Sequence, residues 1–420
     1  MGSRAEAETP VGARQMDRRE FAASGLAALA AAVTTQARPA PPLLTDFSAV
    51  RHSPWTPRDL LLAEIPSLME LATVPGLAFA VVDGSRVTSY VFGMARRELL
   101  QVVTDATEFE AASLGKPVFA AAVLRLVDAG VLELDRPLSS YALLPDATDP
   151  GARAITARHV LSHSTGLPNW REAPGPLVPA SAPGSRFSYS GEGVFYLQRI
   201  IERVVGQPIE HVMREQVLDP LGMASSSYVW RPAFSNTMAT GYDERGVALE
   251  VYADIGRKLQ PLADQWHKPI SEWLYADEDR ATRAAFPSLP PLAQFMMPNV
   301  AGSLFTTIAD YGRFLTAILS DNGGPLAFSA STRRAMATRQ VELNSRLSWG
   351  LGWGLEHDGA DELLWHWGAN GSFRNFVLAD PRRRRAVVVL TNSANGPKLY
   401  ERIITSITGT DHPAFLWFQV

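Results

Sequence analysis

The sequence predicts an α+β protein in which strands near both ends of the chain flank a largely helical middle. Two short apolar segments, 76–82 and 86–93, are separated by the hairpin signal Asp83-Gly84-Ser85. Four further strand-like segments lie between residues 349 and 391, whereas the segments between 113 and 217 mostly have helical spacing. Strands gathered at the ends and helices gathered between them are typical of the α+β class.

Length and composition limit the kinds of protein that the chain can be. With 420 residues, of which 46% are hydrophobic, the chain can bury a large core, and we expect two lobes. The net charge of −4 gives no general attraction to nucleic acid or to anionic membranes. We therefore expect a small-molecule or peptide substrate and no nucleic-acid partner, while the sequence leaves the oligomeric state open. The absence of cysteine excludes disulfides, thiol chemistry and thiolate metal sites, and we expect neither a cofactor nor a metal.

The N-terminal segment has the pattern of an export signal. Arg18-Arg19 precedes the apolar segment 22–33, and Ala37 follows as a candidate cleavage position, which is typical of a twin-arginine signal. The apolar part is too short to cross a bilayer, so we expect no stable membrane anchor. Residues 1–41 are therefore expected to be leader and signal outside the fold, and the mature protein to be periplasmic or secreted. A disordered, alanine-rich tail is the alternative interpretation.

Helical spacing predicts a first helix over 57–73, before the two strands, and a second helix that begins near Ser113 and ends near Gly130. On this second helix Ser113 and Lys116 are three residues apart and share a face. A lysine near a helix N-terminus in apolar surroundings is held in its neutral form, so the pair is a candidate nucleophile and base. The alternative is that Ser113 only caps the helix.

Lysine usage favours the catalytic interpretation of this helix. The chain contains only four lysines, and no second Ser-x-x-Lys occurs in it. A lysine inside an apolar helix of so lysine-poor a chain therefore needs a chemical reason.

The middle of the chain begins with a segment rich in Pro, Gly, Ala and Asp, 143–153, where we expect a boundary between lobes. A short helix is then predicted over 156–163, and on it His159 and His163 are four residues apart. That spacing can hold a metal ion, but no third ligand or adjacent glutamate accompanies the pair. We therefore expect a packing and hydrogen-bonding pair, and a metal hydrolase is the weakest alternative.

The later elements are predicted from spacing and turn residues. Residues 225–300 show no sustained period, and we expect them to form loops over a cleft. The helices that we expect are 194–205, 208–217, 306–319, 329–339 and a last one from Pro397, and the late strands are 349–355, 363–366, 373–378 and 386–391. The four arginines 382–385 lie between the last two strands, which favours a solvated hairpin turn over a phosphate site.

Two further segments carry chemically useful groups. Tyr189 lies where a loop meets a helix, among glycine and serine, so its phenol can point into a cleft. The segment from His366 to Gly371 ends a strand in a glycine-bearing turn, where backbone N–H groups are free to bind an anion. The chain has no Gly-x-Ser-x-Gly elbow, which disfavours the common hydrolase topology.

These motifs together resemble the serine β-lactamase-like and penicillin-binding-protein-like hydrolases. The four that carry the resemblance, in chain order, are Ser113-x-x-Lys116, Leu161 to Pro168, Tyr189-Ser190-Gly191 and His366-Trp367-Gly368. The resemblance runs from about residue 57 to the C-terminus, and the most similar branch contains class C β-lactamases, D-alanyl-D-alanine carboxypeptidases, D-aminopeptidases and related esterases.

The resemblance implies one antiparallel sheet built from N- and C-terminal segments and flanked by helices, with a second, mostly helical lobe beside it. We accordingly expect residues 42–145 and 300–420 to form the sheet lobe. Residues 146–299 would form the helical lobe and the cleft loops, and the site would lie between the two lobes.

The resemblance also implies a role for each motif residue. Ser113 would be the acylated nucleophile and Lys116 its proton acceptor, while Tyr189 would be the general base that shuttles the proton to the leaving group. His366 takes the place of the lysine of a Lys-Thr-Gly triad, and would line the site and support Tyr189 or a substrate carboxylate. The backbone N–H groups of Ser113 and Ala369 would form the oxyanion hole. For Tyr189 the alternative is an ordinary half-buried tyrosine without a catalytic role, and for His366 it is a strand-end histidine without one.

One position departs from the family pattern. The second motif usually ends in asparagine, whereas this chain has Gly191, so the side-chain amide that helps hold a substrate acylamide group is missing there. We therefore expect cleavage of small esters or peptide-like amides. β-Lactamase or D-alanyl carboxypeptidase activity is the alternative, and a non-hydrolytic penicillin-recognition or scaffold protein is the alternative from another class.

Substrate-binding candidates complete the predicted site: Trp170, Glu192, Trp367 and Gly368. For Glu192 the alternative is a cap of the helix that it begins. For Trp170 and Trp367, as for Trp365, the alternative is packing in the core.

Overall fold

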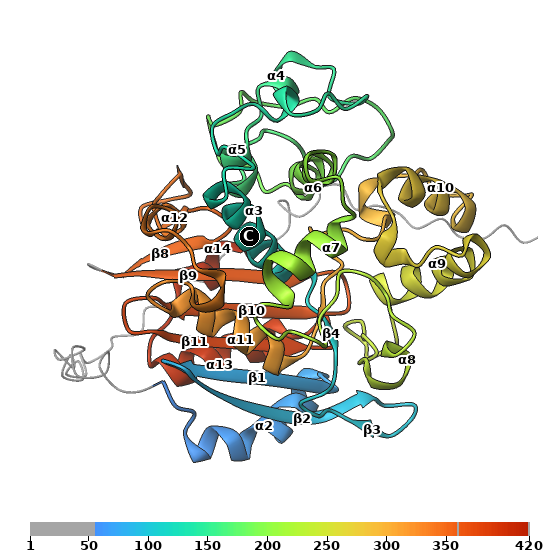
Figure 1. Ribbon diagram of the computed structural model, residues 1–420. Coiled ribbons are helices and arrows are strands. Elements are labelled where there is room, and N and C mark those ends of the chain that lie inside the picture. The colour runs from blue at the N-terminus through green and yellow to red at the C-terminus, as the bar shows by residue number, and fades with distance from the viewer. Residues whose placement is uncertain (1–54, 359–360, 419–420) are drawn as a thin grey trace, which may run out of the picture. The chain divides into compact units, whose positions relative to one another are not determined.

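A nine-stranded sheet with helices on both faces forms the centre of the protein (Figure 1). The computed structural model describes residues 55–358 and 361–418. The strand order is β3-β2-β1-β11-β10-β9-β8-β7-β6, and all neighbouring strands are antiparallel. The predicted α+β class and the single large antiparallel sheet are therefore confirmed, whereas the predicted leader and signal lie outside the described residues.

The sheet joins strands from both ends of the chain. The N-terminal strands are β1 (Gly76–Asp83), β2 (Arg86–Arg96) and β3 (Gln101–Val102). The C-terminal strands are β6 (Val341–Glu342), β7 (Leu347–Trp349), β8 (Gly354–Asp358), β9 (Asp361–Ala369), β10 (Arg374–Asp380) and β11 (Arg385–Thr391). Strand β1 pairs with β11 from Leu77↔Thr391 to Asp83↔Arg385, so the two groups of strands meet inside the sheet (Figure 1).

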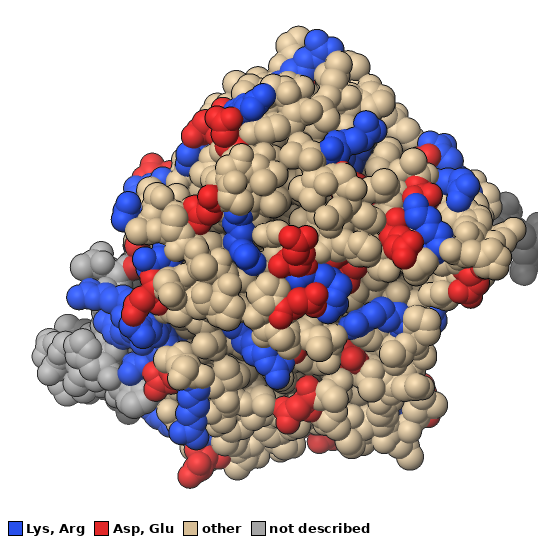
Figure 2. All heavy atoms as spheres, viewed as in Figure 1, with Lys and Arg blue, Asp and Glu red and all other residues tan. Residues whose placement is uncertain are grey.

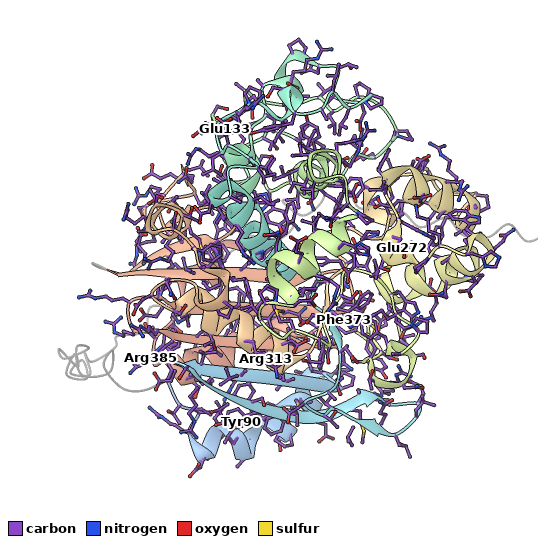
Figure 3. The ribbon with its side chains drawn as sticks, viewed as in Figure 1. Tyr90, Glu133, Glu272, Arg313, Phe373 and Arg385 are labelled. Carbon is purple, nitrogen blue, oxygen red and sulfur yellow. The ribbon has the colours of Figure 1, made fainter. Side chains whose placement is uncertain are left out.

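Each face of the sheet is covered by its own helices. Helix α11 (Ile308–Leu319) packs on one face, and α2 (Asp59–Ala72), α13 (Pro397–Thr408) and α14 (Pro413–Phe418) pack on the other. Alternate residues of β1 enter the two cores, since Ala80 belongs to the first and Phe79 to the second. Phe79 stacks on Tyr90 with ring centroids 4.6 Å apart, and Figure 3 labels Tyr90 on the α2 side of the sheet and Arg313 on α11.

The helical part of the protein lies beside the larger sheet, and the turn Ala112–Leu114 that leads into it contacts β9 (Figure 1). Its helices are α3 (Gly115–Asp128), α4 (Pro150–Arg153), α5 (Ala157–Leu161), α6 (Gly191–Val205), α7 (Ile209–Met213), α8 (Phe234–Thr237), α9 (Tyr252–Trp266), α10 (Tyr275–Ala285) and α12 (Ala330–Met336). The short strands β4 (Phe109–Glu110) and β5 (Phe305–Thr306) pair just before α3 and α11. Helix α3 is buried on nearly every side, as its continuous apolar sequence requires.

Residues 225–300 form more regular structure than the sequence predicts. The expectation of loops alone is wrong, because this stretch contains α8, α9 and α10. Helix α10 buries Glu278 and Thr282, so its inner face is polar and shows no apolar period. Helix α9 contains Pro261 and buries the small residue Gly256, which weakens its helical signal in the same way.

The predicted strand 349–355 is also wrong in detail, because a turn divides it into the end of β7 and the start of β8. Gly352 lies in this turn with a φ of 85°, a conformation that favours glycine. In the described ranges we find no helix long and apolar enough to cross a bilayer. Acidic and basic side chains are interspersed over the face of the molecule shown in Figure 2.

Candidate active site

Ser113 lies in a tight 3-10 turn, Ala112–Leu114, that leads directly into α3. Ala112 has a φ of 51°, a left-handed conformation that is strained for a residue with a side chain. The Ser113 side chain caps neither the turn nor α3. Its Oγ instead lies 2.9 Å from Lys116 Nζ, so the capping alternative is wrong.

Lys116 is buried at the start of α3, and only 4% of its surface is exposed. Its Nζ also donates a hydrogen bond to the backbone oxygen of Ala301 at 2.6 Å. Burial lowers the pKa of Lys116 to about 7, and no carboxylate among the described residues forms an ion pair with it. A large fraction of this amine is therefore neutral near neutral pH and able to accept a proton.

Tyr189 reaches the Ser113–Lys116 pair from the extended segment that precedes α6. Its ring lies 4.2 Å from the His163 ring and 4.7 Å from the Trp367 ring, measured between centroids, and Lys116 Nζ is 4.9 Å from its centre. The hydroxyl is buried near Ser113 without a hydrogen bond of regular geometry. Burial raises the pKa of Tyr189, so the phenol keeps its proton at neutral pH.

His366 is fully buried on β9, close to the same group. Its Nδ1 lies 2.7 Å from the backbone oxygen of Trp367 and donates to it, whereas Nε2 has no hydrogen-bond partner among the residues that the structure describes. Burial, assisted by the nearby charge of Lys116, lowers the pKa of His366 to about 3. The imidazole is therefore neutral at neutral pH, and the predicted support of Tyr189 or of a substrate carboxylate by His366 stays a prediction.

His163 belongs to this cluster, although sequence reasoning considered it only as a packing residue or a metal ligand. Its Nδ1 accepts a hydrogen bond from the Ser190 backbone N–H at 3.1 Å, which fixes the chain beside Tyr189. Helix α5 ends at Leu161 and His163 has a φ of 51°, so the predicted helix over 156–163 is too long. His159 and His163 therefore share no helix face, and the metal hypothesis loses the spacing on which it rested.

A pocket of about 270 Å³ opens beside Ser113. Its walls are Ala112, Ser113, Lys116, Asn169, Trp170, Val251, Tyr252, Ile255, Gln294, Phe295, Ala301, Gly302, Ala369 and Asn370. Four predicted site residues are thus brought together there, namely Ser113, Lys116, Trp170 and Ala369. A group bound in this pocket lies against the proposed nucleophile and against the turn proposed as the oxyanion hole.

Three predicted substrate-binding residues lie elsewhere. Glu192 is 1% exposed and faces Arg171, with 2.7 Å between Oε1 and Nη2, while Ser190 provides the cap of α6. Trp367 packs its ring on Tyr189 and, on the same side of β9, on Trp365. Both the substrate and the cap interpretations of Glu192 are therefore corrected, whereas a contact between the partly buried Trp367 and substrate stays a prediction.

Gly368 is needed for a close approach of two backbone segments. A Cβ at this position would lie 2.2 Å from the backbone oxygen of Ala111, so any side chain would push β9 away from the turn that holds Ser113. Gly368 therefore acts through the backbone, by letting Ala369 lie close to Ser113, and it has no side chain with which to contact substrate.

Asn370 lines the pocket but is not among the site residues predicted from the sequence. Hydrogen bonds hold its side chain in place. Its Nδ2 donates to the Glu110 carboxylate, and its Oδ1 accepts from the Phe373 backbone N–H at 3.0 Å. Glu110 is buried and also accepts from Ala253 at the start of α9 at 2.8 Å. Asn370 directly follows Ala369, so Glu110 fixes both the oxyanion-hole turn and the pocket wall. A lone glutamate and a lone asparagine far apart in the chain give no sequence signal for this contact.

The chain is similar to several known proteins. A family model described as Beta-lactamase matches residues 63–408. Esterase EstB of Burkholderia gladioli is 30% identical over 195 residues, which cover 39% of this chain and 49% of the esterase, so the chain matches about half the length of that relative. Penicillin-binding protein 4 of Amycolatopsis lactamdurans is 25% identical over 363 residues, covering 80% of this chain and 85% of the relative.

Solved structures show the same fold. A class C β-lactamase superposes with a TM-score of 0.64 at 18% identity, covering 83% of this chain and 94% of the other. The D-alanine carboxypeptidase AmpC from Burkholderia cenocepacia superposes with a TM-score of 0.64 at 19% identity, covering 84% and 98%.

Proposed function

Because the chain belongs to the β-lactamase family and is therefore a serine hydrolase, we propose that Ser113 is its acylated nucleophile and that small esters or peptide-like amides are its substrates. The observation that carries this proposal is the 2.9 Å contact between Ser113 Oγ and a buried Lys116 whose pKa is lowered to about 7. A serine with a largely neutral amine beside it, at the wall of a pocket, is the arrangement that acyl transfer requires.

In the proposed reaction, Ser113 Oγ attacks the acyl carbonyl carbon while its proton passes to Lys116 Nζ. We assign stabilisation of the resulting oxyanion to the backbone N–H groups of Ser113 and Ala369, worth roughly 3 kcal/mol per donor. Tyr189, which its raised pKa keeps protonated at neutral pH, then passes its phenol proton to the leaving group as it takes up the proton held by Lys116. Attack of water on the acyl-enzyme by the reverse proton route releases the acid.

The proposed substrates are esters and amides with modest acyl groups, since the pocket measures about 270 Å³ and position 191 carries no amide. β-Lactamase or D-alanyl carboxypeptidase activity is the second candidate, favoured by the shared fold and motif order. Initial rates on p-nitrophenyl esters, D-amino acid amides and a chromogenic cephalosporin separate these candidates. A burst of product without later turnover would instead indicate the non-hydrolytic alternative.

The test of the nucleophile is covalent labelling. A phosphonate ester should give one adduct, found by peptide mass spectrometry on Ser113, and Ser113→Ala should lose both the label and at least 99.9% of the esterase rate, roughly a 10³-fold loss. Ser331→Ala on the exposed surface of α12 is the matched control, which should keep both. Label on another residue, or a Ser113→Ala variant that stays active, would contradict the proposal.

We further propose that the chain is exported to the periplasm or secreted. The support is the twin-arginine pattern at Arg18-Arg19 and the apolar segment 22–33 that follows it.

A further inference from the structure

Gly191 and Trp170 fit together at the wall of the pocket. Gly191 is the first residue of α6, and a Cβ placed on it would lie 2.5 Å from Trp170 Cζ2 and 2.6 Å from Cη2. A side chain at position 191 is therefore excluded while the indole keeps its place. Trp170 thus fills the space into which an asparagine of the Tyr-x-Asn pattern would extend.

Asn169, the neighbour of Trp170, brings a carboxamide to the same place. Its Oδ1 accepts a hydrogen bond from the Gly191 backbone N–H at 2.9 Å, and its backbone oxygen accepts from the Glu192 N–H at 2.8 Å. Because Gly191 is the donor, the oxygen of the amide must face α6, and the planar group turns its NH₂ away from the helix. These two bonds hold Asn169 in one orientation.

The NH₂ group of Asn169 is the oriented donor that remains unused. Asn169 is exposed and lines the pocket together with Ser113, and no described residue accepts a hydrogen bond from its Nδ2. The Asn370 amide is occupied at both ends by Glu110 and Phe373. Gln294 also lines the pocket, but no hydrogen bond from the described part of the chain orients its amide. An oriented donor costs less conformational entropy on binding than a free one, so Asn169 is the stronger candidate.

We propose that Asn169 replaces the missing amide at position 191 and donates a hydrogen bond to a carbonyl oxygen in the acyl part of the substrate. The inference rests on acylation of Ser113, because it concerns the pocket beside that residue. It narrows the substrate class to esters and amides of acids that carry a second carbonyl close to the scissile one, such as N-acylamino acids and short keto acids. Plain alkyl esters are then accepted without this contact.

Three p-nitrophenyl esters with acyl chains of equal length test the proposal: N-acetylglycinate, levulinate and pentanoate. The first two carry the second carbonyl and pentanoate does not, while levulinate lacks the N–H and so isolates the carbonyl. Asn169→Asp keeps an oxygen that accepts from Gly191 but removes the donor. It should lower kcat/KM for N-acetylglycinate and levulinate by roughly 3- to 10-fold relative to pentanoate, as expected for one lost hydrogen bond. Asn169→Ala should lower the same ratio to a similar extent.

Two further variants make the outcomes distinct. Equal losses of kcat/KM on all three esters would assign Asn169 to support of its loop and overturn the proposal. A changed ratio in Gln294→Ala, with an unchanged ratio in Asn169→Asp, would assign carbonyl recognition to Gln294 and overturn it as well. Activity that survives Ser113→Ala contradicts the acyl-enzyme itself, whereas the ester ratio reports on Asn169 alone. Unfolding midpoints of both Asn169 variants verify that the fold is intact.

Discussion

Lys116 is buried at the start of α3 and its Nζ contacts the Ser113 hydroxyl. The protonation state of this amine should therefore control the rate of acylation. Burial lowers its pKa to about 7, so below that pH the amine is charged and cannot accept the serine proton. We predict that kcat/KM for a neutral ester rises as the pH increases through about 7 and then reaches a plateau. A pH–rate profile measured with p-nitrophenyl acetate, corrected for spontaneous hydrolysis, gives this apparent pKa.

Lys116→Arg is the matched control for the pH dependence, since a guanidinium stays protonated and should leave the enzyme nearly inactive across the whole profile. A wild-type profile that shows no change near pH 7, or that rises only near the ordinary lysine value of 10.5, would contradict the assignment of Lys116 as the acceptor.

At the residue scale, the sequence predicts which residues belong to the candidate site better than it predicts their protonation states and hydrogen-bond partners. Spacing together with lysine usage favours Ser113 and Lys116, and resemblance gives roles to Tyr189 and His366, although the roles of all four stay predictions. The neutral state of His366 was not foreseen because it depends on burial by strands that are distant in the sequence. Asn169 was missed because its partner Gly191 is 22 residues away, across a proline-rich loop.

At the scale of elements, α6 and α10 meet through two buried carboxyl groups. Glu202 on α6 accepts from the Ile209 backbone N–H, whereas neither oxygen of Glu278 on α10 has a hydrogen-bond partner within residues 55–358 and 361–418. Burial raises the pKa of both groups, to about 8 for Glu202, and the proximity of Glu202 raises that of Glu278 further. Both are therefore protonated in the folded protein at neutral pH, whereas the unfolded chain ionises them.

This contact should make the protein less stable as the pH rises. The folded pKa lies above the unfolded one, so the unfolded chain releases protons first, and the stabilisation present in acid is lost as the pH increases through about 8. We predict that Glu278→Gln raises the free energy of unfolding at alkaline pH by roughly 1–2 kcal/mol relative to the wild type. Urea unfolding in neutral and in alkaline buffer measures the difference.

Glu272→Gln is the control for this experiment, because Glu272 is exposed and lies near the same helices (Figure 3). It should leave the pH dependence unchanged. A Glu278→Gln variant with the wild-type pH dependence would show that the pair does not titrate on unfolding.

The kind of side chain that a helix buries explains whether the sequence could predict that helix. Helices α2, α11 and α13 bury apolar stripes at helical spacing, and each was found near its observed bounds. Helix α10 buries a glutamate and a threonine, and its contribution to the core cannot be recognised from hydrophobic period.

For the whole molecule, the proposed export is testable without reference to the site. We predict that the full chain, expressed in a bacterium with a functional twin-arginine system, is found in the periplasm or medium with its new N-terminus near residue 38, as read by N-terminal sequencing. Replacement of Arg18 and Arg19 by lysine should leave the protein in the cytoplasm. Efficient export of that double variant would contradict the twin-arginine assignment.

The architecture as a whole followed from resemblance more than from local pattern. Local pattern gives the strands of both ends of the chain, but strand order and register depend on packing between segments that are far apart. The pairing of β1 with β11 is such a case, since the sequence of neither segment indicates with which strand it pairs. The boundaries of the two lobes, 146 and 299, stay predictions.

The position of β1 inside the sheet also constrains how the protein reaches its native state. Strand β11 is made long after β1, so during synthesis the β1–β2 hairpin keeps an unpaired apolar edge until residues 385–391 have left the ribosome. Closing so long a loop makes the native topology one of high contact order, which slows folding and prolongs exposure of that edge. The nascent chain therefore completes its sheet only once β11 has emerged, and a chaperone that covers β1 in the interval would raise the yield of active enzyme.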